Sequence, residues 1–476
     1  MTRFPARQLI TMRHGRMLRN KSERKLLRMS ARLVAIAILG LAIIGFAPHA
    51  FAAKIERITS PGGIEAWLVS DKTLPLIAMT FAFSGAGAAQ DAAQKPGVAY
   101  LAAHMMDEGA GDLDTKAFRE ALDSRAIEMQ FNAARDDVRG SLRTLSENRN
   151  EAFRLLRLTL TAPRFDAEPL ARVRGEILSG LRRETTSPSS LSNRSFWRAA
   201  YGDHPYGRPT EGTLESVPQI EAADLKAFTA RTFARDNLKV AIVGDITASD
   251  AGHLLDEAFG ALPAKAQLDP VPPVTMQNIG KQIETALDVP QAVITFGGAG
   301  IARNDPDFMA AYIVNHIAAG GTFSSRLYRE VREKRGLAYS VGTSLIWLDH
   351  AALFAGSTAT RADRAHETLK VITSELQRLA QDGPTQQELD EAKSYLKGSQ
   401  MLALDSSTKL AAQLVQYQLD RLGIDYIDKR AAIIDAVTLD DAKRLAKRIL
   451  SGGLLVSTVG PTPEKVSEKA TPKNNP

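Results

Sequence analysis

The sequence predicts a duplicated α+β fold: one chain that contains two homologous α/β-sandwich halves. An apolar run follows Pro75 and another follows Pro290, at an offset of 215 residues. Apolar runs that close the two halves contain Val243 and Val459, at an offset of 216 residues. Two independent offsets that agree within one residue indicate a duplication. At 476 residues the chain is also too long for one hydrophobic core.

The first half predicts strands, several helices and a closing strand. Val98, Leu101, Ala102 and Met105 recur at i, i+3, i+4 and i+7, which is the buried stripe of an amphipathic helix. By the same reading of periodicity, the first half has strands at 76–83 and 238–244, and helical stretches at 115–125, 147–160, 169–183 and 214–233.

The second half repeats this order, and strands gathered with helices on one face give a layered sandwich in each half. Four prolines and little periodicity indicate that 263–277 is a linker. It separates a first domain, 53–262, from a second domain, 278–466. We expect 467–476 to be a disordered tail. The second half has strands at 292–296 and 454–460, a glycine-rich turn at 297–300, and helices at 308–318 and 439–449.

The charge of the chain is unevenly distributed. Residues 1–52 hold ten Lys and Arg residues and one acid, Glu23, so the rest of the chain is slightly acidic despite a pI of about 9.3. This distribution does not indicate a nucleic-acid partner. The chain has no cysteine, which excludes a disulfide framework, a thiolate nucleophile and a Cys-type zinc site.

The basic excess is typical of an export signal. Arg28 and Arg32 precede the apolar run 33–46, and Ala50-Phe51-Ala52 is a small-x-small cleavage site, so the mature chain should begin at Ala53 in the periplasm. The apolar run is 14 residues, too short for a comfortable membrane span. The alternative is an uncleaved signal that anchors the chain in the inner membrane. Translation from Met1 or from Met29 fits the sequence equally.

Three blocks resemble one known family. Residues 97–109, 204–209 (His-Pro-Tyr-Gly-Arg-Pro) and 325–341 are similar, in order and spacing, to blocks of the pitrilysin/insulinase family of inverted zinc peptidases, which includes the mitochondrial processing peptidase. The resemblance covers about residues 55–465. It implies two halves that face each other as a clamshell.

The family's zinc motif is not intact here. The inverted motif His-x-x-Glu-His supplies two ligands and a general base from one helix, but this chain has Tyr100, Ala103 and His104, which we place on the face opposite the buried stripe. The resemblance puts Gly180 where the family has its third ligand, a glutamate. His104 with Glu108 would be a weak metal site, so we interpret His104 as a relic and expect no metal in this chain.

The second-half block, by contrast, is intact. Ser324 or Ser325 should cap a helix through Arg332 and Lys334, and Gly336 should end it in the left-handed conformation before a strand at 337–341. In active family members an Arg and a Tyr at the spacing of Arg332 and Tyr339 hold the substrate carbonyl. The resemblance therefore implies the same substrate and oxyanion binding role for these two residues.

Loss of the zinc motif beside an intact Arg/Tyr pair predicts a non-catalytic subunit of an exported heterodimeric zinc metalloendopeptidase. A sister chain with His-x-x-Glu-His would hold the zinc, and peptides or unfolded proteins would be the substrates. One alternative is a stand-alone peptide-binding or scaffold protein without catalysis. A further alternative is an active zinc peptidase with a rebuilt metal site.

Overall fold

The computed structural model describes residues 54–321 and 323–461. The predicted export signal at 1–52, its cleavage point before Ala53 and the tail at 467–476 lie outside the described residues. Across the described part of the chain, no helix combines the length and apolarity needed to cross a bilayer.

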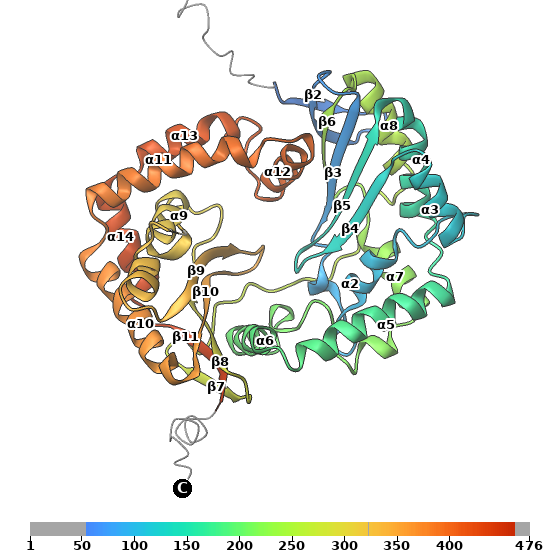
Figure 1. Ribbon diagram of the computed structural model, residues 1–476. Helices are drawn as coiled ribbons and strands as arrows, with labels where there is room; N and C mark the ends of the chain where they lie inside the picture. The colour runs from blue at the N-terminus through green and yellow to red at the C-terminus, as the bar shows by residue number, and fades with distance from the viewer. Residues whose placement is uncertain (1–53, 322, 462–476) are drawn as a thin grey trace, which may run out of the picture. The chain divides into compact units, whose positions relative to one another are not determined.

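The first half is built on a six-stranded sheet of order β1-β2-β6-β3-β5-β4 (Figure 1). β2 and β6 pair in parallel and the other neighbours are antiparallel. β3 lies in the middle of the sheet and is buried along nearly its whole length, which explains its continuous apolar sequence. The strands are β1 (Glu56–Thr59), β2 (Glu65–Ser70), β3 (Leu76–Ser84), β4 (Glu128–Ala133), β5 (Asp137–Leu145) and β6 (Leu238–Gly244).

Helices of the first half bury their apolar stripes in the main core beneath this sheet, except α6, which packs on the second sheet. Several begin at side chains that cap the backbone, such as Asp114, Ser187 and Thr247. They are α2 (Val98–Met105), α3 (Thr115–Asp123), α4 (Arg149–Thr161), α5 (Ala167–Glu184), α6 (Pro188–Tyr201), α7 (Ala222–Thr232) and α8 (Ala248–Phe259), with 3₁₀ turns η1 (Ala88–Gln90), η2 (Ser146–Asn148), η3 (Pro205–Gly207) and η4 (Val217–Gln219).

The second half has a five-stranded sheet of order β7-β11-β8-β10-β9. Its strands are β7 (Gln282–Ala286), β8 (Gln291–Ala299), β9 (Ala338–Trp347), β10 (Ala352–Arg361) and β11 (Leu455–Gly460). Its helices are α9 (Phe308–Asn315), the π-helices η5 (His316–Gly320) and η6 (Tyr328–Glu333), the 3₁₀ turn η7 (Ala362–Arg364), α10 (Ala365–Asp382), α11 (Gln386–Ala403), α12 (Ser407–Leu419), α13 (Tyr426–Ala436) and α14 (Leu439–Leu450).

The two sheets share one topology. β3, β5, β4 and β6 of the first sheet occupy the places of β8, β10, β9 and β11 in the second, and the parallel pair β2–β6 corresponds to β7–β11. This agreement fits the duplication expected from the sequence offsets. The predicted α+β class with two α/β-sandwich halves is confirmed.

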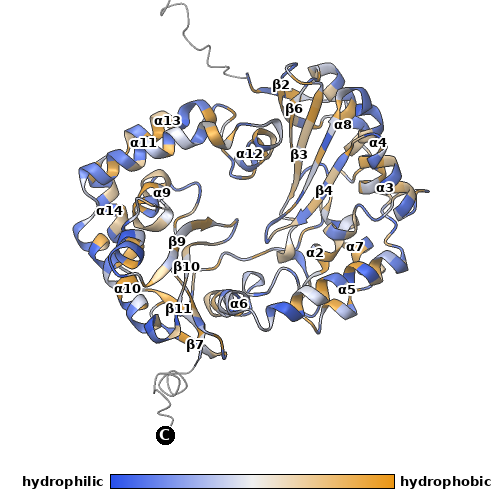
Figure 2. Ribbon diagram, in the orientation of Figure 1, coloured by the Kyte–Doolittle hydropathy of each residue, from blue (hydrophilic) through white to orange (hydrophobic). Residues whose placement is uncertain are grey.

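One helix from each half packs on the sheet of the other half. α6, from the first half, packs on β8 and β11, whereas α12, from the second half, packs on β3 and β6 (Figure 1). Ser192 of α6 donates a hydrogen bond to Thr295 of β8 at 2.8 Å, and Gln418 of α12 donates one to the carbonyl of Val240 at 2.9 Å. The apolar stretches of both sheets seen in Figure 2 are thus covered partly by the opposite half.

One local prediction for the second half is wrong. Gly297 and Gly298 continue β8 instead of forming a turn. A Cβ at Gly297 would lie 2.4 Å from the carbonyl oxygen of Phe354 and 2.8 Å from the ring of Phe196, so glycine is needed there for close packing of β10 and the exchanged helix α6. The helix predicted at 308–318 is confirmed: it is α-helical to Asn315 and continues as the π-helix η5.

The proline-rich segment 263–277 contains no helix or strand, but it is bonded to both halves. The N–H of Val274 donates to the carbonyl of His350 at 2.9 Å, and the N–H of Gln277 donates to the carbonyl of Ala200 at 2.8 Å. The predicted linker is therefore an irregular segment that is hydrogen-bonded to both halves.

Candidate functional site

Tyr100 and His104 lie together on helix α2. The two rings are 4.1 Å apart, and Nδ1 of His104 lies 2.9 Å from the carbonyl oxygen of Tyr100. Burial, and then the charges of Glu211 and Glu184, raise the pKa of Tyr100. His104 is thus engaged within its own helix, as the relic interpretation expects.

Ala103 does not lie on the face predicted for it. Its side chain is 1% exposed and belongs to the main core with the apolar stripe of α2. The correction has a simple cause, since α2 is covered by α5, α7 and β4 and so buries more than one stripe. A methyl group suits this crowded position, where the family motif has a glutamate base.

Glu108 is buried and ion-paired with two arginines. Its side chain is 3% exposed and forms ion pairs with Arg119 and Arg172, each at 2.5 Å. Two guanidinium groups therefore already neutralise the carboxylate that the sequence offered as a weak second ligand beside His104. Gly180 lies on α5, and Glu176, one turn earlier, pairs with Arg172 at 2.8 Å. Among residues 54–321 and 323–461, no group of three or more His, Cys, Asp or Glu side chains is placed to hold a metal ion.

Arg332 and Tyr339 are brought together by the structure. The guanidinium carbon of Arg332 lies 4.4 Å from the ring centroid of Tyr339 and 5.0 Å from that of Tyr328. Arg332 also donates a hydrogen bond to the hydroxyl of Tyr328. Tyr339 is 80% exposed, which is unusual for so large an aromatic side chain. Its ring is held by Arg332, while its hydroxyl is open to a ligand.

Arg332 stands on a π-helix, which the sequence did not reveal. In η6 the N–H of Lys334 donates to the carbonyl of Arg329, five residues earlier, at 2.9 Å. Short π-helical turns occur often at functional sites. Gly336 has φ of +59°, so the predicted left-handed ending is confirmed. The predicted cap is wrong for Ser325, whose hydroxyl is buried without a hydrogen-bond partner.

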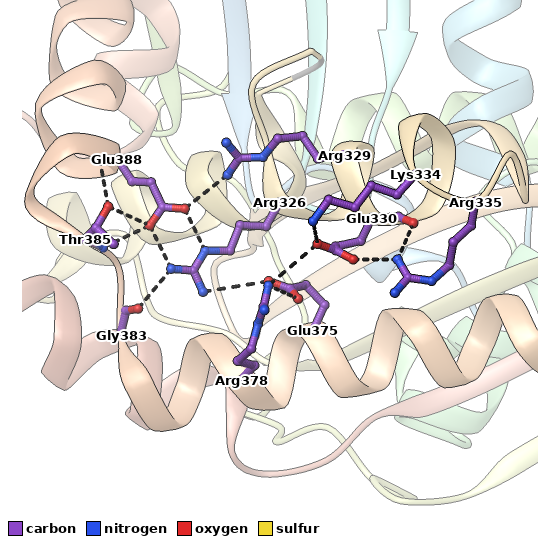
Figure 3. Close-up of polar contacts among 10 residues, drawn as sticks. All are labelled: Arg326, Arg329, Glu330, Lys334, Arg335, Glu375, Arg378, Gly383, Thr385 and Glu388. Atoms are coloured by element: carbon purple, nitrogen blue, oxygen red, sulfur yellow. Dashed lines mark hydrogen bonds and ion pairs between the residues drawn. The ribbon is translucent and has the colours of Figure 1, made fainter.

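A network of charges anchors this π-helix to α10 and α11 (Figure 3). We call it the Arg326 network; its members are Arg326, Arg329, Glu330, Lys334, Arg335, Glu375, Arg378 and Glu388. Arg326 is 9% exposed. It donates two hydrogen bonds to the carboxylate of Glu388, at 2.8 and 2.7 Å, and one to the carbonyl of Gly383 at 3.1 Å. Burial alone raises the pKa of Glu388, but hydrogen bonds from Arg326 and Thr385 outweigh it and lower the pKa to about 2.

The remaining ion pairs of the network lie near the C-terminal end of η6. Glu330 accepts hydrogen bonds from Lys334 at 2.7 Å and from Arg335 at 2.5 Å, and Arg378 of α10 pairs with Glu375 at 2.5 Å. The dense alternation of Arg and Glu in 326–335 was the available sequence signal. Because such charges usually lie on solvated faces, their partners in α10 and α11 could not be read from the sequence.

The block 204–209 joins the two halves. Tyr206 donates a hydrogen bond to Asp136 at 2.5 Å, and the N–H of Asp349 donates to the other oxygen of Asp136 at 3.0 Å. The N–H of His350 donates to the Tyr206 hydroxyl at 3.2 Å. The turn between β9 and β10 is thus held against the turn between β4 and β5 by one buried tyrosine.

Family models match both halves of the chain. Residues 82–214 match the model for insulinase (peptidase family M16), and residues 219–396 match that for the peptidase M16 inactive domain. The chain belongs to the insulinase family. Its three sequence blocks and its duplicated sheets are the family's motifs and fold, so the resemblance inferred from the sequence is confirmed.

Similar members of the insulinase family carry different names. An uncharacterized zinc protease of Streptomyces coelicolor is 28% identical over 87% of this chain and 91% of its own. The non-peptidase homolog YmxG of Helicobacter pylori is 29% identical over 69% of this chain and 76% of its own. A crystal structure of a peptidase M16 inactive domain from Pseudomonas fluorescens is 30% identical, covers 86% of this chain and 98% of its own, and has a TM-score of 0.81.

The chain is an inactive peptidase homologue of the insulinase family. The sequence resemblance places Tyr100, Ala103, His104 and Gly180 at the family's zinc-site positions, and of these only His104 is a residue of the family motif.

Proposed function

We propose that this chain is the non-catalytic subunit of an exported heterodimeric zinc metalloendopeptidase. In this proposal a sister chain carrying His-x-x-Glu-His holds the zinc, and this chain supplies Arg332 and Tyr339 to the carbonyl of the bound peptide. Arg332 provides a charge that does not titrate, and Tyr339 provides a hydroxyl donor for the negative charge that develops on the carbonyl oxygen.

The observation that carries the proposal is the contact between half-buried Arg332, on the anchored π-helix η6, and exposed Tyr339, on the adjoining strand β9. Catalytic donors must be held in place before the reaction. Here Arg332 is fixed by Tyr328 and Tyr339, and the helix that bears it is fixed by the Arg326 network. The second candidate function, a stand-alone scaffold, needs no such donor. The name of the Helicobacter pylori relative, a non-peptidase homolog, favours that second function. A rebuilt zinc site is disfavoured because Glu108 is neutralised by Arg119 and Arg172.

We expect the purified chain to bind no stoichiometric zinc and to hydrolyse no unstructured peptide by itself. Peptide hydrolysis should appear when a sister chain with His-x-x-Glu-His is added, and a chelator should abolish it. Metal analysis and turnover of a fluorogenic peptide measure these effects. One tightly held zinc per isolated chain, with chelator-sensitive proteolysis, would contradict the proposal.

We also propose that the chain acts in the periplasm and begins at or near Ala53. The support is the apolar run 33–46 followed by the small-x-small site at Ala50-Phe51-Ala52. N-terminal sequencing of the protein from the envelope fraction checks this expectation. An intact N-terminus recovered from the inner membrane would indicate the anchor instead.

A further inference from the structure

An arginine-lined pocket of 140 Å³ lies in the first half of the chain. It is lined by residues 190–197 of α6, by the end of α5, by the turn after β4 and by the loop that follows η3. The charges that act on Tyr100 belong to this pocket, since Glu184 and Glu211 both line it. The charged and aromatic lining residues are Arg135, Arg194, Arg208, Glu184, Glu211 and Trp197.

The charges of this pocket do not balance within the described residues. Glu184 is neutralised by Arg194, at 2.9 Å. Neither Arg135 nor Arg208 forms an ion pair with any described residue, and the one remaining carboxylate, Glu211, forms none either. Two unpaired guanidinium groups therefore stand against one unpaired carboxylate, which leaves the pocket with an excess of positive charge.

Arg135 is oriented for a ligand. Its guanidinium carbon lies 3.7 Å from the ring centroid of Trp197, and its Nε donates a long hydrogen bond of 3.4 Å to the carbonyl of Tyr206. Stacking of this kind fixes the plane of the guanidinium group and leaves its edge free for a planar, bidentate acceptor. Arg208 donates from Nη1 to the carbonyl of Asp91 at 2.9 Å, while its Nε is buried without a partner.

Both arginines are half-buried, and nearby charges offset the cost of this burial only in part. Burial lowers the pKa of Arg135, and Glu211 and Asp136 only partly oppose the effect. Burial also lowers the pKa of Arg208, against the charge of Asp91. A buried charge is costly unless it is paired, so an anion that enters the pocket would remove an existing penalty.

We propose that this pocket binds a carboxylate group of a peptide, with Arg135 as its principal partner. The volume is well below the roughly 300–1,000 Å³ of sites that enclose a whole small molecule, so the pocket takes one charged group. A peptide carboxylate comes either from the C-terminus or from an Asp or Glu side chain, and both match the planar fork of Arg135. The site needs neither zinc nor a second chain.

Trp197 gives a direct reading of binding to the isolated protein. The chain has three tryptophans, and the other two, Trp67 and Trp347, do not line this pocket. The probes are the tripeptide Ala-Ala-Ala, its C-terminal amide, N-acetyl-Ala-Asp-Ala amide and inorganic phosphate. We expect saturable changes in Trp197 fluorescence with one or both peptides that carry a carboxylate, and none with Ala-Ala-Ala amide. The signal should vanish in Trp197→Phe.

Arg135→Ala should weaken peptide binding by about tenfold or more, since hydrogen bonds to charged groups are among the strong ones. Arg198→Ala is the matched control, because Arg198 is an exposed arginine on the same helix as Trp197 and pairs with Asp203 at 2.8 Å. Equal binding of the acid and amide forms by the wild-type chain would overturn the proposal, as would binding of phosphate alone. Unchanged affinity of a folded Arg135→Ala protein would also overturn it. Because proteolysis is not measured, failure of the subunit proposal would leave this result unaffected.

Discussion

Tyr339→Phe is expected to lower peptide turnover by the reconstituted pair about a hundred- to a thousand-fold, the usual effect of removing one oxyanion donor. The variant keeps the ring that contacts Arg332 and removes only the hydroxyl. Arg332→Ala should have an effect of the same order. Arg332→Lys should also fail, because an ammonium group cannot reproduce the planar fork of the guanidinium.

Two matched variants separate this effect from general damage. Tyr395→Phe removes a hydroxyl from another exposed tyrosine of the second half, and Arg361→Ala removes an exposed arginine from β10 of the same sheet. Both should retain near wild-type turnover, and thermal melting should show all variants assembled. If Tyr339→Phe and Arg332→Ala both stay within about threefold of wild type, far short of a donor effect, the pair is not catalytic and the scaffold function gains support.

Arg326→Met is expected to destabilise the second half strongly. It removes the guanidinium that faces both half-buried Glu388, at 2.7 Å, and buried Glu375, at 3.7 Å. Loss of one partner from a buried ion pair typically costs about 3–5 kcal/mol. The π-helix η6 should open most, because Arg326 ties its N-terminal side to α11. Hydrogen exchange over residues 323–339, together with thermal melting, measures this opening.

Arg329→Met is the control for Arg326→Met. Arg329 contacts the same carboxylate, Glu388, at 3.2 Å, but its side chain is 42% exposed, so its loss should cost no more than about 1 kcal/mol. The pKa of Glu388 falls from 4.5 to about 2 in the folded chain, so the network stabilises above pH 4.5 and weakens as the pH falls toward 2. The difference between wild type and Arg326→Met should therefore shrink in acid. Equal protection of residues 323–339 in both variants at neutral pH would refute this role.

Much of the fold was readable because local sequence patterns persist in the structure. The period of α2, the buried run of β3 and the two matching offsets depend on neighbours close in the chain or on the duplication itself. The left-handed Gly336 was likewise predicted from local chemistry. Exchange of α6 and α12 between the halves had no such signal, since an amphipathic helix does not specify which sheet it covers.

Sequence alone determined that the motif His-x-x-Glu-His is absent from the helix of His104, because residue identity decides which side chains can ligate a metal, and it predicted Tyr100, Ala103 and Gly180 as the altered zinc positions. It also identified Arg332 and Tyr339 as a candidate pair. Only the tertiary structure decided that their side chains touch, that Glu108 is neutralised by arginines, and that Gly297 lies in a strand. These outcomes depend on contacts between residues far apart in the chain. Burial and charge pairing arise from such contacts, and no local pattern encodes them.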